Sequence, residues 1–390
     1  MLTIKLAWRN LIGAGLRTWL NVIVLSISFV VIIWHRGMLD GWHKQARLDT
    51  IDWEIGGGEF WHKNYDPYDP FTLLDSHGTL PPEITNEMNR GLLTPILITQ
   101  ATIYPQGRML SVLLKGIDPK QQILKIPAEK LNENIYEIPL LIGTRMAEAI
   151  KLNIGDLVTI RWRDANETFD AAEGRIVGLF KTNVSMVDNG QMWLPLERLR
   201  QMMQMPGEAT IVITSEKADI NTSIEGWPFQ DQKSLLTDID QTIEQKKIGG
   251  SIIYIVLLLL AMLAIFDTQI LSIFRRQKEI GTQIALGMTR GQVIRLFTLE
   301  GAMHSILAAG VAAIYGIPLL SMQAINGIPM PENTDEYGMA IAEKIFPVYS
   351  VGLIITTTVV IFIVATIVSF IPARRISKMR PTDAIRGKIN

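Results

Sequence analysis

The chain has no cysteine among its 390 residues. It therefore forms no disulfide, has no thiolate nucleophile and cannot bind zinc through cysteine ligands. Its five histidines are scattered, and no two have the spacing of a His-Glu-x-x-His zinc motif. We expect no metal site and no cofactor within this chain.

Two further kinds of catalytic motif are missing. No Gly-Lys-Ser/Thr occurs, so the sequence has no Walker A loop for the phosphates of ATP. Gly56-Gly57-Gly58 has no lysine behind it and predicts a flexible turn. The Gly-x-Ser-x-Gly elbow of serine hydrolases is also absent. We therefore expect a non-catalytic chain whose energy source lies on another protein.

Long apolar runs, in contrast, are abundant. Hydrophobic residues make up 48% of the chain, and the mean hydropathy is +0.22. A helix needs roughly 20 mostly apolar residues to cross a bilayer. Four stretches qualify, although His304, Ser305 and Pro318 interrupt the third. We expect transmembrane helices over residues 18–40, 248–273, 301–322 and 350–371.

Basic residues gather at one end of these spans. Lys5, Arg9 and Arg17 precede the first span, five basic residues lie between spans two and three, and six follow span four. The positive-inside rule then places both termini in the cytoplasm and residues 41–247 outside. No small-residue cleavage site follows the first span, so we expect an anchor that stays in the chain.

The remaining connections fit this topology. Residues 1–17 have apolar side chains at helical spacing and predict an interfacial amphipathic helix on the inner membrane surface. Residues 372–390 predict a basic cytoplasmic tail. Residues 323–349 are acidic and predict a short periplasmic loop.

Residues 41–247 show strand signals separated by short helices. The runs at 95–104 and 109–116 are apolar and β-rich, and the Pro-Gln-Gly-Arg between them predicts a hairpin. Helical periodicity at 233–248 predicts a stalk helix, with residues 38–51 as its partner. The expected fold is thus a membrane protein with four transmembrane helices and a large α+β periplasmic domain inserted between spans one and two.

Residues 274–300, which we call the basic connection, join spans two and three. This segment is amphipathic, and the span on each side holds it at the membrane surface, where a cytoplasmic partner can push it. Asp267 lies just before it, and an acid within a span is costly and often functional. Its place two turns before Arg275 and Arg276 favours a hydrated or paired interfacial residue, with a proton relay as the alternative.

Four groups of residues carry a resemblance to a known family. They are Ala7-Trp8-Arg9-Asn10-Leu11, then Leu141-Ile142-Gly143-Thr144 with Gly155-Asp156, then Arg275-Arg276-Gln277-Lys278-Glu279-Ile280-Gly281 with Ala285-Leu286-Gly287, and finally Pro372-Ala373-Arg374-Arg375. In this order and topology the chain resembles the four-span permease subunits of MacB/FtsX-type ABC transporters.

The resemblance implies a multi-pass permease of the bacterial inner membrane. It would pair with a second permease subunit, identical or related, and with a cytoplasmic ABC ATPase that holds ATP and Mg²⁺. Hydrolysis would then drive conformational work in the periplasm, a mechanism called mechanotransmission. The basic connection would supply the residues that couple to the ATPase: Arg275, Arg276, Glu279, Ile280, Gly281, Ala285, Leu286 and Gly287.

Within the family, the block at 116–156 and the long stalk are most similar to the lipoprotein-releasing LolC/LolE branch. That branch implies extraction of lipoproteins from the inner membrane and delivery to a periplasmic carrier, which the loops at 59–80 or 104–109 would hold. MacB-like efflux of small molecules or peptides and FtsX-like regulation of a periplasmic enzyme are the alternatives. A membrane-anchored binding module without an ATPase is a further alternative from another class.

In the lipoprotein branch, acyl chains enter a cavity between spans one and two. By resemblance, its lining here would be Val24, Ile27, Val31, Ile255, Leu259 and Met262. Membrane lipids are expected partners, and nucleic acid is not.

Overall fold

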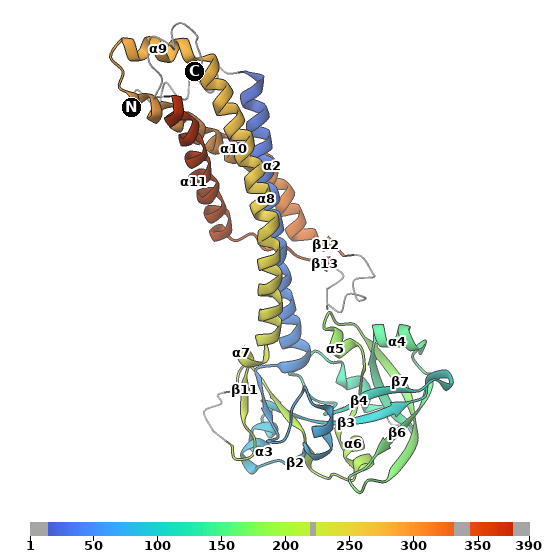
Figure 1. Cartoon of the computed structure of the whole chain (residues 1–390). Coiled ribbons are helices and arrows are strands. Elements are labelled where there is room, and N and C mark those ends of the chain that lie inside the picture. Colours follow the sequence, from blue (N-terminus) through green and yellow to red (C-terminus); the bar gives the residue numbers. More distant parts are fainter. Residues whose placement is uncertain (1–14, 134, 219–223, 331–343, 377–390) are drawn as a thin grey trace. The chain divides into compact units, whose positions relative to one another are not determined.

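The computed structural model describes residues 15–133, 135–218, 224–330 and 344–376 (Figure 1). The chain divides into two compact units. We call Met1–Trp42, Ile243–Ile328 and Ile345–Asn390 the helical bundle, and His43–Thr242 with Pro329–Lys344 the inserted domain. Most of the expected interfacial helix and basic tail lies outside the described residues.

Four long helices build the bundle: α2 (Leu16–Thr50), α8 (Thr237–Arg275), α10 (Arg290–Asn326) and α11 (Val351–Ile376). Each is long and apolar enough to cross a membrane, and α10 runs through Pro318 without ending. Val22, Leu25 and Phe29 recur on one face of α2 and form the bundle core with small residues of α10 and α11. These helices, with the large α/β domain between the first two, confirm the expected fold class.

Two glycines one turn apart on α2 allow another segment to pack directly on this helix. A Cβ on Gly41 would lie 2.2 Å from the Phe346 carbonyl oxygen, and one on Gly37 would lie 2.3 Å from the Tyr349 ring. The Val348 amide donates a 2.9 Å hydrogen bond to the Gly37 carbonyl. Small residues four positions apart commonly permit such close approach in membrane helices.

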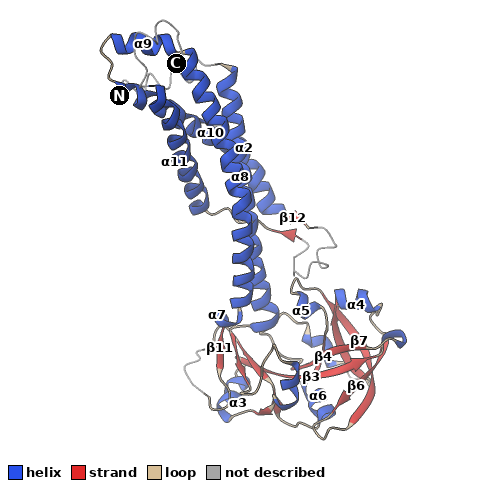
Figure 2. Cartoon of the chain, in the orientation of Figure 1, coloured by secondary structure: helices blue, strands red, loops and turns tan. Residues whose placement is uncertain are grey.

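The inserted domain is built on strands, and short helices lie between them (Figure 2). The strands are β1 (Gly58–Trp61), β2 (Gly78–Thr79), β3 (Leu93–Ile103), β4 (Leu110–Ile117), β5 (Ile138–Gly143), β6 (Leu157–Arg163), β7 (Phe169–Phe180), β8 (Gln191–Pro195), β9 (Glu208–Ala209), β10 (Ile211–Thr214) and β11 (Phe229–Asp231). The helices are α3 (Pro82–Asn89), α4 (Thr144–Ile150), α5 (Ser185–Asp188), α6 (Leu196–Met203) and α7 (Gln232–Leu235), with 3-10 turns η2 (Pro70–Asp75), η3 (Pro105–Gly107) and η4 (Ala128–Asn132). Two short strands, β12 (Ile328–Pro329) and β13 (Lys344–Ile345), precede α11.

Nine of these strands form one mixed sheet in the order β11-β1-β10-β3-β4-β8-β5-β7-β6. The expected hairpin is confirmed, because β3 and β4 pair antiparallel with Ile103 opposite Leu110. The parallel pairs β4–β8 and β5–β7 join segments far apart in sequence. Local turn signals cannot predict such pairs, since each one depends on contacts made only after the chain has folded back.

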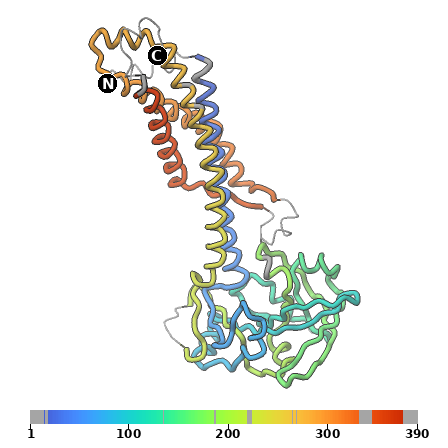
Figure 3. Tube along the Cα trace, in the orientation of Figure 1, coloured from blue at the N-terminus to red at the C-terminus, as the bar shows by residue number. Residues whose placement is uncertain are grey.

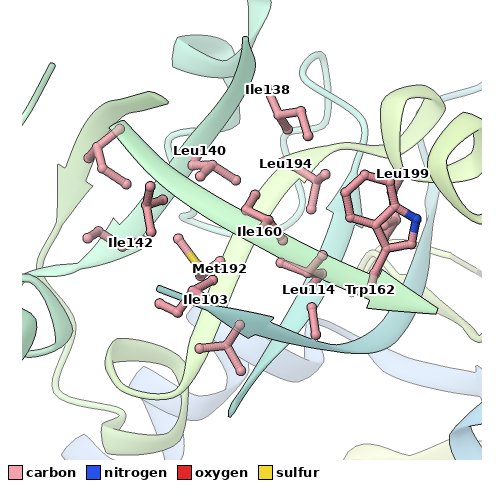
Figure 4. Close-up of a cluster of buried hydrophobic side chains, with 14 of the residues drawn as sticks. Ile103, Leu114, Ile138, Leu140, Ile142, Ile160, Trp162, Met192, Leu194 and Leu199 are labelled. Carbon is pink, nitrogen blue, oxygen red and sulfur yellow. The ribbon is translucent and has the colours of Figure 1, made fainter. Parts of the chain in front are cut away.

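Alternation along the strands places a hydrophobic core on each face of the sheet. Leu140 and Ile142 of β5 enter one core, and Leu141 between them enters the other. Figure 4 shows the first core, where Ile160 lies between the β5 side chains and Trp162. Burial on both faces explains why β5 reads as a continuous apolar run.

The helices α2 and α8 run side by side, although their sequences are almost 200 residues apart (Figure 3). In the inserted domain, His43 Nε2 lies 2.8 Å from Asp240 Oδ1, and Arg47 also bonds Asp240. The hydrogen bond from Arg47 is the main cause that lowers the pKa of the Asp240 carboxyl. In the bundle, Lys247 Nζ lies 2.8 Å from Asp40. Polar contacts therefore hold the two helices together beyond their apolar runs.

A π-helical turn, η1 (Ile51–Ile55), follows α2 within the inserted domain. The glycines that follow do not form the expected flexible turn. Gly56 and Gly58 have φ angles of 55° and 135°, and a Cβ on Gly57 would lie 2.6 Å from the Ser215 carbonyl. Gln232 of α7 donates a 2.6 Å hydrogen bond to the Gly56 carbonyl. The junction is thus a packed turn bonded to α7, the short helix that precedes α8.

Glu59 is buried directly beside this junction. The Trp61 indole donates a 2.5 Å hydrogen bond to its carboxylate. Burial raises the pKa of Glu59 to about 7, because the charged form is poorly solvated there, and the Glu54 carboxylate acts in the same direction. The Trp61 hydrogen bond and Lys115 act in the opposite direction.

Glu59 should therefore make the stability of the inserted domain depend on pH. Between pH 4.5 and 7 the folded state keeps a proton that the unfolded chain releases, so stability falls as pH rises. The full loss above pH 7 is about 3 kcal/mol. We expect Glu59→Gln to remove this slope and to raise the free energy of unfolding at pH 8, measured by denaturant titration with tryptophan fluorescence. Glu83→Gln, at an exposed position of α3, should keep it. A wild-type slope in the Glu59 variant would show that Glu59 does not titrate in this range.

Candidate functional site

The basic connection folds as a helix, a turn and a helix start. Its short helix is α9 (Gln277–Ala285), and Arg276 separates it from α8. Gly287 has a φ of 102° and makes the turn, which few other residues would tolerate. Thr289 and Gln292 then form a reciprocal capping box that starts α10. The sequence thus fixes both ends of α9 locally.

One face of α9 packs against the end of the bundle. Ile280 is 3% exposed and lies in a cluster with Ile273 of α8, Val293 and Phe297 of α10, and Ala373 of α11. Burying side chains of this size stabilises the packed helix by roughly 1.5–3 kcal/mol each. The short helix is therefore held against three membrane helices, and a force on it reaches all of them.

An ion pair strengthens this attachment. Arg276 lies 3.1 Å from the carboxylate of Glu300, which is buried on α10, and 3.0 Å from Glu279 on α9. Its guanidinium also lies 5.1 Å from the centre of the Phe297 ring. Arg276 thus connects the end of α8 to both following helices from inside the chain.

The helices approach most closely just beyond this pair. A Cβ on Gly301 of α10 would lie 1.9 Å from Ser369 Oγ of α11 and 2.8 Å from the amide nitrogen of Gln269 on α8. Both polar side chains are buried. The absence of a side chain at residue 301 therefore lets three helices meet at one point.

The expected coupling residues separate into two groups. Ile280 and Gly281 are buried, and the Arg276 side chain is mostly covered, so these three act within the chain. The exposed members are Arg275, Glu279, Ala285, Leu286 and Gly287. Leu286 is 83% exposed, although a leucine is costly to leave in water. The exposed group ends α9 and forms the surface available to a partner.

Sequence reasoning missed Glu300 and Phe297. Glu300 was detectable as a lone acid at the edge of the third apolar run, where a carboxylate needs a cationic partner. Its partner could not be chosen from sequence, because several basic residues lie within reach. Asp267 is exposed on α8, and its role stays a prediction.

The expected acyl-chain residues lie on α2 and α8 without an enclosing wall among the described residues. Ile27, Ile255 and Leu259 are each about half exposed, and Met262 packs partly against the bundle core. Half of the most apolar window of α2 is buried, but only 12% of that of α8. The surface of α8 is therefore the least covered of the four spans.

Breaking the ion pair should loosen the basic connection. We expect Glu300→Gln to destabilise the bundle by about 3 kcal/mol, because it leaves Arg276 without its buried partner. The double variant Arg276→Gln/Glu300→Gln should be less destabilised than the sum of the single variants. Thermal melting of the purified protein in detergent measures both effects. Arg275→Gln, at an exposed neighbour, is the control, and unchanged melting of Glu300→Gln would contradict a structural role.

Comparisons with known proteins agree with this architecture. Residues 251–381 match the family model described as FtsX-like permease C-terminal. The chain is 22% identical over 409 aligned residues to the "Lipoprotein-releasing system transmembrane protein LolC" of Neisseria meningitidis serogroup B, with 95% of this chain and 94% of that protein covered. It is 23% identical over 154 residues to the "Macrolide export ATP-binding/permease protein MacB" of Burkholderia lata, which covers 39% of this chain and 20% of that protein.

Among solved structures, the extracellular domain of the noncanonic ABC-type transporter YknZ from Gram-positive bacteria matches 42% of this chain and 84% of that one, at 16% identity and a TM-score of 0.26. A TM-score of 0.26 is too low to indicate a shared fold. The family match, in contrast, begins in α8 and ends beyond α11, so it contains the whole basic connection. Residues 251–381 therefore form an FtsX-like permease domain, and the chain as a whole is similar to ABC transporter permease proteins of the LolC and MacB kinds.

Proposed function

We propose that this permease uses ATP hydrolysis by a separate cytoplasmic subunit to move its inserted domain in the periplasm, and that its cargo is lipoprotein drawn from the inner membrane. One observation carries the choice of cargo. The similarity to LolC extends over 95% of the chain and so includes the inserted domain, whereas the MacB similarity covers 39%. No feature of the described residues favours efflux of small molecules or regulation of a periplasmic enzyme over extraction of lipoproteins.

The exposed end of α9 supports an ATPase contact. Leu286 projects from the turn with Ala285 and Gly287 exposed beside it, and Glu279 adds a carboxylate for a basic partner. An exposed apolar side chain in a polar surround is typical of an interface anchor. ATP and Mg²⁺ belong to that partner in this proposal.

The stalk supports transmission of the motion. From Arg275, beside α9, the helix α8 continues without a break for 39 residues to Thr237, about 60 Å of rise. Near its far end, Asp240 holds His43 and Arg47 of α2. A continuous helix of this length, held to α2 by these polar contacts, transmits a displacement of one end to the other end.

The bare surface of α8 supports a second permease subunit. Only 12% of its most apolar window is covered within the chain. A partner permease facing α2 and α8 would close a cavity, and Ile27, Ile255 and Leu259 would then line it toward acyl chains. A single chain offers one wall of that cavity.

Changing Leu286 tests the ATPase contact. We expect Leu286→Asp to reduce the amount of ATPase that co-purifies with the tagged permease by roughly tenfold or more, as for loss of an interface anchor. Its melting temperature should not change, because residue 286 is exposed. Leu286→Met keeps the apolar surface and should retain the ATPase. Equal recovery with the aspartate variant would show that the contact lies elsewhere.

The cargo is tested by mass spectrometry of the complex purified gently from its native membrane. An ATPase together with acylated lipoproteins is the expected result. An adaptor protein or outer-membrane channel in their place would favour efflux, and a cell-wall hydrolase would favour regulation. Absence of any ATPase, under conditions where a known ABC complex survives, would contradict the proposal as a whole.

A further inference from the structure

A pocket of about 350 Å³ lies in the helical bundle between α2 and α8, where both helices leave their apolar runs. On α2 its lining begins at Ile32 and ends at Asp40, and on α8 it extends from Glu244 to Leu257. The lining residues recur every three or four positions, so each helix presents one face to the pocket. Its volume falls in the lower part of the range of small-molecule sites.

The side chains that line this pocket change from apolar to charged along its length. Ile32 and Leu257 line it at the end that continues into the apolar core of the bundle. In the next layer, the Arg36 guanidinium lies 4.9 Å from the centre of the Tyr254 ring. Glu244 lies ten residues beyond Tyr254, about 15 Å along the helix. The pocket is therefore apolar inside, cationic in the middle and anionic at its mouth.

The charges in the two outer layers are not all neutralised by the chain. Lys247 is held by Asp40 at 2.8 Å. Arg36 and Glu244 are exposed, and neither forms an ion pair with another residue of the described part of the chain. His35 adds a ring nitrogen beside Arg36, and its ring lies against the backbone of α8, where a Cβ on Gly250 would be 2.6 Å from it.

We propose that this pocket binds the headgroup of an aminophospholipid, which carries both a phosphate and an ammonium group. The phosphate binds Arg36 and His35, because a guanidinium fork pairs well with phosphate oxygens. The ammonium binds Glu244 at the mouth, and the acyl chains follow Ile32 and Leu257 into the bilayer. The order of layers in the pocket is the order of groups in the lipid itself, with the ammonium outermost, the phosphate beneath it and the chains deepest.

This proposal goes beyond the cargo and does not depend on it. A resident phospholipid would cover part of the bare surface of α8, in the place where a lipid-modified cargo would enter between α2 and α8. A cargo lipid without a phosphate would leave Arg36 unpaired and would have to displace the resident lipid. The headgroup pocket would then discriminate between bulk lipid and cargo.

The test uses the full chain, purified in mild detergent, stripped of lipid and titrated under native mass spectrometry. The three probes share the same acyl chains: phosphatidylethanolamine, phosphatidylglycerol, which lacks the ammonium, and diacylglycerol, which lacks the phosphate as well. We expect the affinity to fall in that order. Glycerophosphoethanolamine, the headgroup without chains, should compete poorly, which separates a lipid site from a site for soluble phosphates.

Two variants assign the layers. Arg36→Gln should weaken phosphatidylethanolamine binding about tenfold or more, as for loss of a charged hydrogen-bond partner. Glu244→Gln should make phosphatidylethanolamine and phosphatidylglycerol bind equally. Lys246→Gln is the matched control, because Lys246 is an exposed cation on α8 outside the pocket lining and should bind lipid like the wild type.

Three outcomes would overturn the proposal: wild-type lipid affinity in Arg36→Gln, equal binding of phosphatidylethanolamine and phosphatidylglycerol to the wild type, or equal binding of diacylglycerol. Should Arg36→Gln melt below the wild type, Arg36→Lys replaces it, since lysine keeps the charge without the fork and should bind with intermediate affinity. Lipid binding needs neither ATPase nor cargo, so this result is independent of whether lipoprotein co-purifies.

Discussion

The continuity of α2 and α8 is the constraint on which the rest of this structure depends. Each helix continues from a hydrocarbon environment into water without a break. Each therefore needs apolar side chains in the first environment and polar side chains in the second. In the bundle, α2 supplies apolar side chains such as Val22 and Phe29. Beyond the apolar runs, polar contacts take over, from Asp40 with Lys247 to Asp240 with His43. The backbone hydrogen bonds are made within each helix, as a hydrocarbon environment requires.

Both ends of this helix pair are fixed to short, irregular elements. At one end, Arg276 holds α9 against α10 through Glu300. At the other, the π-helical turn η1 and the glycines after it pack against Ser215 and Gln232. π-helical turns are rare and are found mostly at functional sites. Buried pairs and close backbone contacts of this kind are either made or broken, with few intermediate arrangements, and so they suit elements that move as units.

The sequence predicted what depends on composition and on local periodicity. The four spans, the β3–β4 hairpin and the amphipathic segment between spans two and three all follow from apolar runs, turn residues and charge. What it could not predict depends on contacts between distant residues. Ile280 was expected among the residues that couple to the ATPase, but it is buried in a cluster with Val293 and Phe297. The same holds for Gly56 and Gly57, which are typical of flexible turns in isolation but fill a junction where a Cβ would clash.

The four spans are buried to different extents within the chain. α2 is the most buried of the four spans and shares one apolar core with residues of α8, α10 and α11, whereas only 12% of the most apolar window of α8 is buried. Lipid can solvate an apolar helix at no cost, so a bare α8 is stable in a bilayer and does not by itself demand a protein partner. What lipid tails cannot satisfy is the charged end of the same surface, where Arg36 and Glu244 remain without ion pairs in the described chain. Groups in that order of charge match a ligand that is polar at one end and apolar at the other, and the bilayer itself contains such molecules.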